Sequence, residues 1–130
     1  MTERSSGVLR RTLSRLASSA KEHEAAELRE GCVEVGATLV ADLPAREHVV
    51  VAGTLRTVTL RPRAGVPALV AELYDGSGTV SIVWLGRRQI PGIEPGRSIV
   101  CSGRVTLDHE RPVIFNPRYE LRPVGTSEPL

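Results

Sequence analysis

Aromatic residues are scarce in this sequence, which has one Trp, one Phe and two Tyr among its 130 residues. A core built on large rings is therefore excluded. The apolar share is nevertheless 41%, which lies in the ordinary range for globular proteins. We therefore expect a packed core filled mainly by Val, Ile and Leu, in a chain with room for one domain and an appendage.

Cysteines and long apolar runs are also few. Cys32 and Cys101 are far apart and form no Cys-x-x-Cys pair, so we expect no disulfide framework and a reducing compartment. No apolar run approaches the roughly 20 residues that a membrane-spanning helix needs. The first residues are not followed by the apolar segment of a secretory signal. The sequence therefore predicts a cytoplasmic protein that does not associate with a membrane.

Patterns typical of enzymes are missing as well. His23, His48 and His109 are scattered, without the His-x-His or Glu-x-x-His spacing that chelates a metal ion. There is no Gly-x-Ser-x-Gly nucleophile motif and no Gly-x-x-x-x-Gly-Lys-Ser/Thr phosphate loop. Asp108 and Glu110 flank a predicted hairpin turn, but no base or metal ligand supports them as a catalytic pair. We expect a protein that is not an enzyme and has no cofactor or metal.

Lysine is nearly absent, because 16 of the 17 basic residues are Arg and only Lys21 is Lys. A guanidinium group binds phosphate through two parallel N–H groups and stacks on bases, which an ammonium group does not do. A codon bias toward Arg explains the same composition equally well. Residues 1–45 contain six basic and seven acidic side chains, whereas residues 46–130 contain eleven and eight. The basic surplus therefore lies in the second part of the chain.

The N-terminal part predicts an amphipathic helix over residues 6–30. Leu9, Leu13, Leu16 and Ala20 are spaced so that they share one face of a helix. Arg residues occupy its first half and Glu residues its second, which opposes the helix macrodipole. Two copies packed antiparallel would instead place each basic half beside an acidic half. This layout favours binding of a protein partner or a second copy through residues 6–30.

The second part of the chain alternates between apolar and polar residues, with Gly and Pro at the breaks. This pattern predicts five strands, at residues 47–60, 67–74, 79–85, 98–107 and 112–121. Gly53 lies inside the first strand, and Leu55 and Val58 are three residues apart, so we expect a bulge there. Pro117 is compatible with the last strand only at an edge or a bulge.

Five strands at this spacing, with a long first strand and an irregular segment at 86–96, match an OB fold. The predicted fold is all-β, a five-stranded Greek-key barrel preceded by an α-helix. The chain divides into a helix with a connector at 1–46, the barrel at 47–122 and a flexible tail at 123–130.

Three segments carry a resemblance to a known family: LYDGSGTVSIVWLG at 73–86, IEPGRSIVCSGRV at 93–105 and NPRYEL at 116–121. The sequence resembles the nucleic-acid-binding OB domains of the tRNA-anticodon-binding type, most of all the wedge OB domain of RecG helicase. The resemblance covers about residues 47–121. It implies binding of single-stranded or branched DNA, or of RNA, in a groove over the second and third strands, with a role in DNA repair or recombination.

Arginines lie in the loops and strands that would border this groove. Arg61 and Arg63 follow the first strand on a loop that contains Pro62 and Gly65, and a second pair follows the third strand. The predicted phosphate-binding residues are, in full, Arg56, Arg61, Arg63, Arg87, Arg88, Arg104, Arg111 and Arg118.

Base stacking requires an aromatic residue on the outer surface. By alternation Tyr74 faces outward and is the best stacking candidate, although the neighbouring Glu72 repels phosphate. Trp84 shares the face of the core residues, and Phe115 and Tyr119 are expected in the core or as edge cover. The sequence therefore predicts a non-catalytic nucleic-acid-binding protein of modest affinity. The alternative is a protein-interaction adaptor that uses the barrel as a scaffold.

Overall fold

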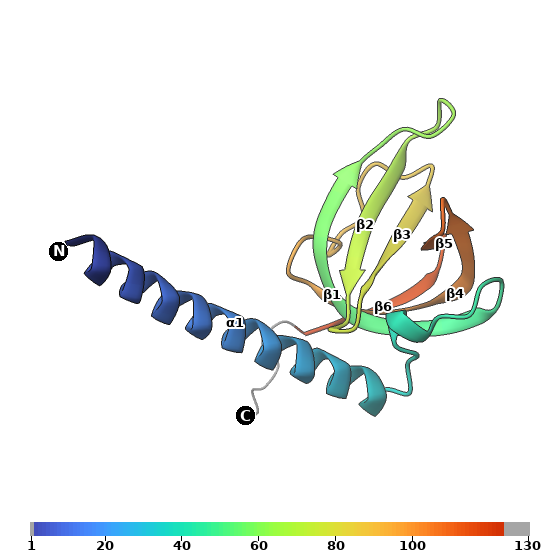
Figure 1. Ribbon diagram of the computed structural model, residues 1–130. Helices are drawn as coiled ribbons and strands as arrows, with labels where there is room; N and C mark the ends of the chain where they lie inside the picture. The colour runs from blue at the N-terminus through green and yellow to red at the C-terminus, as the bar shows by residue number, and fades with distance from the viewer. Residues whose placement is uncertain (1, 124–130) are drawn as a thin grey trace.

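The computed structural model describes residues 2–123, with side chains from residue 14 onward, and consists of a long helix beside a β-sheet (Figure 1). Helix α1 is Thr2–Glu34, and the short 3₁₀ helix η1 is Val40–Asp42. The strands are β1 (His48–Leu60), β2 (Ala68–Tyr74), β3 (Thr79–Leu85), β4 (Ser98–Asp108), β5 (Arg111–Phe115) and β6 (Arg118–Arg122).

Helix α1 is longer than the predicted 6–30 and continues through Gly31. The side chains of Leu9 and Leu13, on the predicted apolar stripe, lie outside the described part, as does the predicted tail after Pro123. Within residues 2–123, no helix combines the length and apolar character that crossing a bilayer requires.

The sheet closes on itself. β2 pairs with β1 and β3, β3 pairs in parallel with β5, and β5 pairs with β4. β4 then pairs with β1, which completes a ring of five strands. The first strand makes this possible because its first half, 48–54, pairs with β4 and its second half, 54–60, pairs with β2. This closure is the arrangement that an OB fold requires.

The predicted fifth strand is split, so the described residues form six strands rather than five. β5 ends at Phe115 and β6 begins at Arg118, and both pair with β4. Asn116, between them, has a φ of 46°, and Pro117 has no N–H to donate. The expectation that Pro117 lies at an irregularity is therefore confirmed, and the irregularity interrupts the strand.

The predicted bulge in β1 is also present. Leu55 lies opposite Leu73, but Thr57 lies opposite Glu72, so Arg56 is an extra residue in β1. A side chain at Gly53 would collide with the backbone oxygen of Tyr74. The close approach of β1 and β2 therefore requires glycine at this position.

The inside of the ring is aliphatic, as the composition predicts. Leu55, Leu73, Ile82, Ile99 and Ile114 are among its fully buried side chains. Trp84 is the aromatic residue in this core. It is 5% exposed, which confirms the prediction that it packs in the core. Tyr119 covers its edge, with ring centroids 5.7 Å apart, and remains 41% exposed.

Helix α1 is attached to the sheet through the turn between β2 and β3. Arg29 Nη1 donates a hydrogen bond of 2.9 Å to the carbonyl oxygen of Gly76, and Cys32 is buried. Gly76 has a φ of 91°, and a side chain there would collide with the carbonyl oxygen of Ala25. By contrast, every residue from 14 to 24 is exposed. The attached part of α1 therefore begins at about Ala25.

Asp75 fixes this turn. Its carboxylate is fully buried and accepts hydrogen bonds from the backbone N–H groups of Val40 (2.7 Å), Ser77 (2.8 Å) and Gly78 (3.1 Å). It also accepts one from the Ser77 hydroxyl, at 2.7 Å. Asp75 thus holds the turn between β2 and β3 together, and it also joins η1 to the sheet.

Candidate nucleic-acid interface

The outward side chains of β2, β3 and β5 form one continuous surface. Leu69, Ala71 and Leu73 of β2 belong to the core, so the residues that alternate with them face outward. A second apolar cluster lies there, outside the ring, and includes Phe115. We call this surface, together with the adjoining Arg56 of β1, the outer face. It comprises Arg56, Ala68, Val70, Glu72, Tyr74, Ser81, Val83, Val113 and Phe115.

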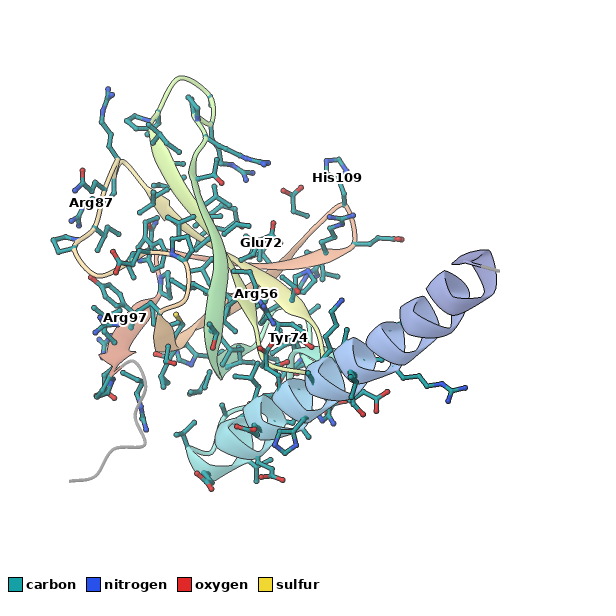
Figure 2. The ribbon with its side chains drawn as sticks, turned by 90° about the vertical axis from the view of Figure 1, so that its left-hand side faces the viewer. Arg56, Glu72, Tyr74, Arg87, Arg97 and His109 are labelled. Atoms are coloured by element: carbon teal, nitrogen blue, oxygen red, sulfur yellow. The ribbon has the colours of Figure 1, made fainter. Side chains whose placement is uncertain are left out.

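Tyr74 lies at the end of the outer face that is nearest α1, and an arginine covers its ring. The Arg56 guanidinium carbon is 4.6 Å from the centroid of the Tyr74 ring. Arg56 Nη2 also makes an ion pair with Glu24 Oε1 of α1, at 2.5 Å. Figure 2 shows Arg56 and Tyr74 together beside the helix. The bulge in β1 makes this contact possible, because it turns the extra residue toward the outside.

Phe115 also lies on the outer face, and its ring is likewise covered by the guanidinium group of an arginine. The Arg63 guanidinium carbon is 5.1 Å from the centroid of the Phe115 ring, and Arg63 Nη2 is 3.6 Å from Asp108 Oδ2. Phe115 is therefore half-buried outside the ring, where it covers the buried cluster of Ala68, Val83 and Val113. Of the two positions expected for it, core or edge cover, it does not take the one inside the ring. Its outward direction follows from alternation with Ile114, which is fully buried.

The loop that carries Arg63 is a tight hairpin. Arg63 and Val66 exchange both backbone hydrogen bonds, at 2.8 and 2.9 Å. Ala64 and Gly65 between them have φ values of 48° and 82°, as two-residue hairpin turns require. The loop between β1 and β2 therefore holds the Arg63 backbone in place, at little further entropic cost when a ligand binds.

Other predicted arginines lie near this hairpin, at the rim of the outer face. Arg61 begins the same loop and is exposed. Arg87 and Arg88 follow Gly86, whose N–H donates to the carbonyl oxygen of Pro67 at 2.7 Å, so the two loops adjoin. Figure 2 shows Arg87 far from Tyr74. Arg111 begins β5 opposite Asp108.

The last two predicted arginines differ in their place on the ring. Arg104 of β4 alternates with the buried Val105, which lies opposite the buried Ile114 of β5, so Arg104 faces the same side as Phe115. Arg118 is in β6, which pairs with β4 and with none of β2, β3 and β5. The structure therefore brings Arg56 and Arg63 to Tyr74 and Phe115, and places Arg104 on the adjoining strand, but it does not bring Arg118 there.

The charge of this surface is mixed. Glu72 is exposed between Tyr74 and Val70, and Glu24 and Asp108 pair with the two arginines. Attraction between this surface and a polyanion is therefore weaker than the arginines alone would provide.

Both cysteines are buried. Burial raises the pKa of the Cys101 thiol to about 12, and burial together with the nearby Asp75 raises the pKa of Cys32. Both thiols are therefore protonated near neutral pH. Among the residues whose side chains are described, no three His, Cys, Asp or Glu residues come together as metal ligands.

A hollow of about 420 Å³ lies away from the outer face, between α1 and strands β1 and β4. Leu28, Cys32, Ala52 and Ile99 line it, along with others. None of the predicted phosphate-binding or stacking residues is among its lining residues. We interpret it as a gap in the packing of α1 against the sheet.

Glu24, Asp108 and Phe115 are the outer-face contacts that sequence reasoning missed. Glu24 and Arg56 are 32 residues apart, and no local spacing connects them. Asp108 is recognisable only as a turn residue. Phe115 follows Ile114 in β5, so the alternation of a strand predicts that the two side chains face opposite sides of the sheet. Because both residues are apolar, alternation alone does not tell which of them faces inward.

The chain matches the family model of the OB-fold nucleic acid binding domain of the tRNA anti-codon type over residues 49–122. The match begins in β1 and ends with β6, so it covers the whole ring and more than half of the sequence. No curated protein matches the chain. Since both the strand pairing and the family model agree, the chain belongs to the family of OB-fold nucleic acid binding domains.

Proposed function

We propose that this protein binds single-stranded nucleic acid on its outer face, with phosphates held by Arg56, Arg61 and Arg63 and a base stacked at Tyr74. The observation that carries the proposal is the pairing of arginines with aromatic rings on one surface of a nucleic acid binding domain. Aromatic side chains and arginines together are the contacts that single strands make with such domains. The proposed role is binding without catalysis.

Branched DNA is part of the proposal, with a role in repair or recombination. The likeness of residues 73–86 and 93–105 to the wedge domain of RecG helicase supports it. At a branch point, unpaired bases are available to an aromatic ring, whereas bases inside a duplex are stacked on one another. We therefore expect single strands and branched DNA to bind more tightly than linear duplex of the same length.

The expected affinity is modest. Each stacked base contributes about 1–3 kcal/mol, and few aromatic rings are available. Phosphate contacts release counterions from the nucleic acid, so the logarithm of the binding constant falls with the logarithm of the salt concentration, by about 0.7 per phosphate on a single strand. The carboxylates on the outer face reduce the electrostatic part further.

Fluorescence anisotropy tests the proposal. The probe is a labelled single strand of about 20 nucleotides, longer than the roughly 4–16 nucleotides that one OB fold covers, in low salt. DNA and RNA strands of one sequence form two arms. We compare the wild type with the double variant Arg56→Ala/Arg63→Ala. The matched control, Arg118→Ala/Arg122→Ala, removes the same charge from β6, which contributes no residue to the outer face.

We expect the first variant to bind at least about tenfold more weakly than the control, because each charge-assisted contact contributes about 1.5–3 kcal/mol when the partner groups are well placed. Equal weakening in both variants would place the interface elsewhere. Absence of binding by the wild type at tens of micromolar, or binding that is insensitive to salt, would refute nucleic-acid binding by this mechanism.

A second candidate function is protein interaction through α1. Residues 14–24 are all exposed, Leu16 is 63% exposed, and Figure 1 shows this part of the helix extending beyond the sheet. An antiparallel contact with a second copy would place arginines beside glutamates. Light scattering on the full chain and on a chain lacking residues 1–20 tests self-association. The candidate fails if both are monomeric at high concentration.

A further inference from the structure

Tyr74 and Phe115 are each covered by an arginine. In both cases this arginine also forms an ion pair with an acidic residue from another segment of the chain. At Tyr74 the partner is Glu24, which reaches across from α1 to Arg56. At Phe115 the partner is Asp108, at the turn between β4 and β5. Each site therefore consists of an aromatic ring, a guanidinium group over it and a carboxylate that holds the guanidinium group.

The groups in this arrangement resemble those of a bound polynucleotide. A planar guanidinium group over an aromatic ring occupies the place where a base would stack. A carboxylate beside the same guanidinium group occupies the place of a phosphate, since Arg binds both groups through its parallel N–H donors. A ligand that approaches the outer face therefore competes with Glu24 and Asp108 for the arginines.

We propose that Glu24 and Asp108 set the affinity of the outer face, because they occupy Arg56 and Arg63 in the free protein and must be displaced by the phosphates of a single strand. This inference rests on the proposed function of the outer face. It assigns a part of the binding site to α1, which lies outside the residues matched by the family model.

The position of Glu24 supports this role. It is the last residue of the exposed segment and directly precedes Ala25, where α1 contacts the sheet. The hydrogen bond from Arg29 to Gly76 and the burial of Cys32 hold this part of the helix against the sheet. Glu24 is therefore presented to Arg56 from a fixed backbone, while its side chain, 56% exposed, remains free to turn away.

The sequence offers matched controls for both carboxylates. Glu22 lies two residues before Glu24 on the same helix, and Glu110 lies two residues after Asp108 at the same turn. Neither makes an ion pair within the part of the chain whose side chains are described. Replacing either control residue with Gln changes the net charge equally, but leaves the pairs on the outer face intact.

The test measures the binding of the labelled single strand by anisotropy in low salt. The variants are Glu24→Gln with its control Glu22→Gln, and Asp108→Asn with its control Glu110→Gln. We expect Glu24→Gln to bind about two- to fivefold more tightly than Glu22→Gln, which corresponds to the free energy of an exposed ion pair. We expect a smaller gain for Asp108→Asn, because its separation from Arg63 is longer.

A double variant decides whether the gain acts through the arginine. Glu24→Gln in the background Arg56→Ala should bind no more tightly than Arg56→Ala alone. Equal affinities of Glu24→Gln and Glu22→Gln, a gain that persists without Arg56, or weaker binding by Glu24→Gln would each overturn the inference while the proposed function stands. Absence of binding by the wild type and every variant would instead remove the proposed function, and this inference with it.

Discussion

Leu73 and Tyr74 are adjacent residues of β2, yet their surroundings differ completely. Leu73 is fully buried inside the ring among aliphatic side chains. Tyr74 lies on the outer face under Arg56 and next to α1. The same alternation separates Ile82 from Val83 in β3 and Ile114 from Phe115 in β5. The two faces of one short sheet thus hold the core and the proposed binding surface.

This difference shows that stability and binding are carried by alternate residues. Substitutions inside the ring should lower the free energy of unfolding, and substitutions on the outer face should change affinity while leaving the fold intact. Each of the following predictions compares the effect of a change inside the ring with that of a change on the outer face, or concerns a residue that belongs to neither.

The largest expected effect is that of Leu73→Ala. Loss of a fully buried leucine side chain leaves a cavity and should lower the free energy of unfolding by about 2–5 kcal/mol. Urea unfolding followed by the fluorescence of Trp84, the single Trp, measures it. Glu72→Ala, one residue away on the outer face, should change stability by less than about 0.5 kcal/mol. Similar losses in the two variants would contradict the separation of the faces.

The second largest effect is expected for Asp75→Ala, which should lower the free energy of unfolding by at least about 2 kcal/mol. The change removes the acceptor of three backbone N–H groups, of which that of Val40 is buried and those of Ser77 and Gly78 are partly buried. Asp75→Asn keeps one oxygen acceptor, so we expect a smaller loss. Denaturant unfolding of both variants checks the order, and an Ala variant as stable as the wild type would exclude this role.

Tyr74→Ala should lower the affinity for the labelled single strand by about 1–3 kcal/mol, the contribution of one stacked base. Its stability should stay close to that of the wild type, because the ring is outside the core. Tyr74→Phe keeps the stacking surface and serves as the control, with nearly unchanged affinity. If Tyr74→Ala bound as well as Tyr74→Phe, the base would not stack at this position.

Glu110→Gly should stabilise the protein by about 1 kcal/mol. His109 and Glu110 form the turn between β4 and β5, and both have positive φ, at 52° and 67°. This conformation is unfavourable for residues with a side chain and favourable for Gly. Glu110→Ala removes the same charge without this gain. Thermal unfolding of both variants should give the higher midpoint to Glu110→Gly, and the reverse order would contradict the argument.

The smallest expected effect is on Trp84 fluorescence. Trp84 lies inside the ring and is 5% exposed, so a strand bound on the outer face does not contact it. Saturating single strand should leave its emission almost unchanged, under conditions where anisotropy reports complete binding. Strong quenching would mean that the ligand reaches the inside of the ring or that the fold opens on binding.

The strands were largely predictable because alternation is a local property. β3 matches the predicted 79–85, and β1, β2 and β4 differ from prediction by one residue at an end. The bulge near Leu55 was readable as a change of parity, and Gly53 as a close approach of two strands. The break between β5 and β6 was foreseen only as an irregularity at Pro117, since the positive φ of Asn116 has no clear sequence signal.

The candidate site was predictable only in part. Alternation placed Tyr74 outside the ring and Trp84 inside it, and the position of Arg63 in a loop predicted that it borders the binding groove. The sequence offered no means to separate Arg56 and Arg63 from Arg118, because the order of the strands around the ring decides which arginines share a surface. Nor did it indicate that Phe115 lies outside the ring.

The sequence by itself determined the strand-forming segments, the aliphatic core and the family, because these depend on residues that are near one another in the chain. Tertiary structure decided which charges meet. Glu24 reaches Arg56 only because α1 rests on the turn at Gly76, and Asp108 reaches Arg63 only because the ring closes through β3 and β5. Ion pairs act over a few ångströms in space, and separation along the chain carries no information about that distance.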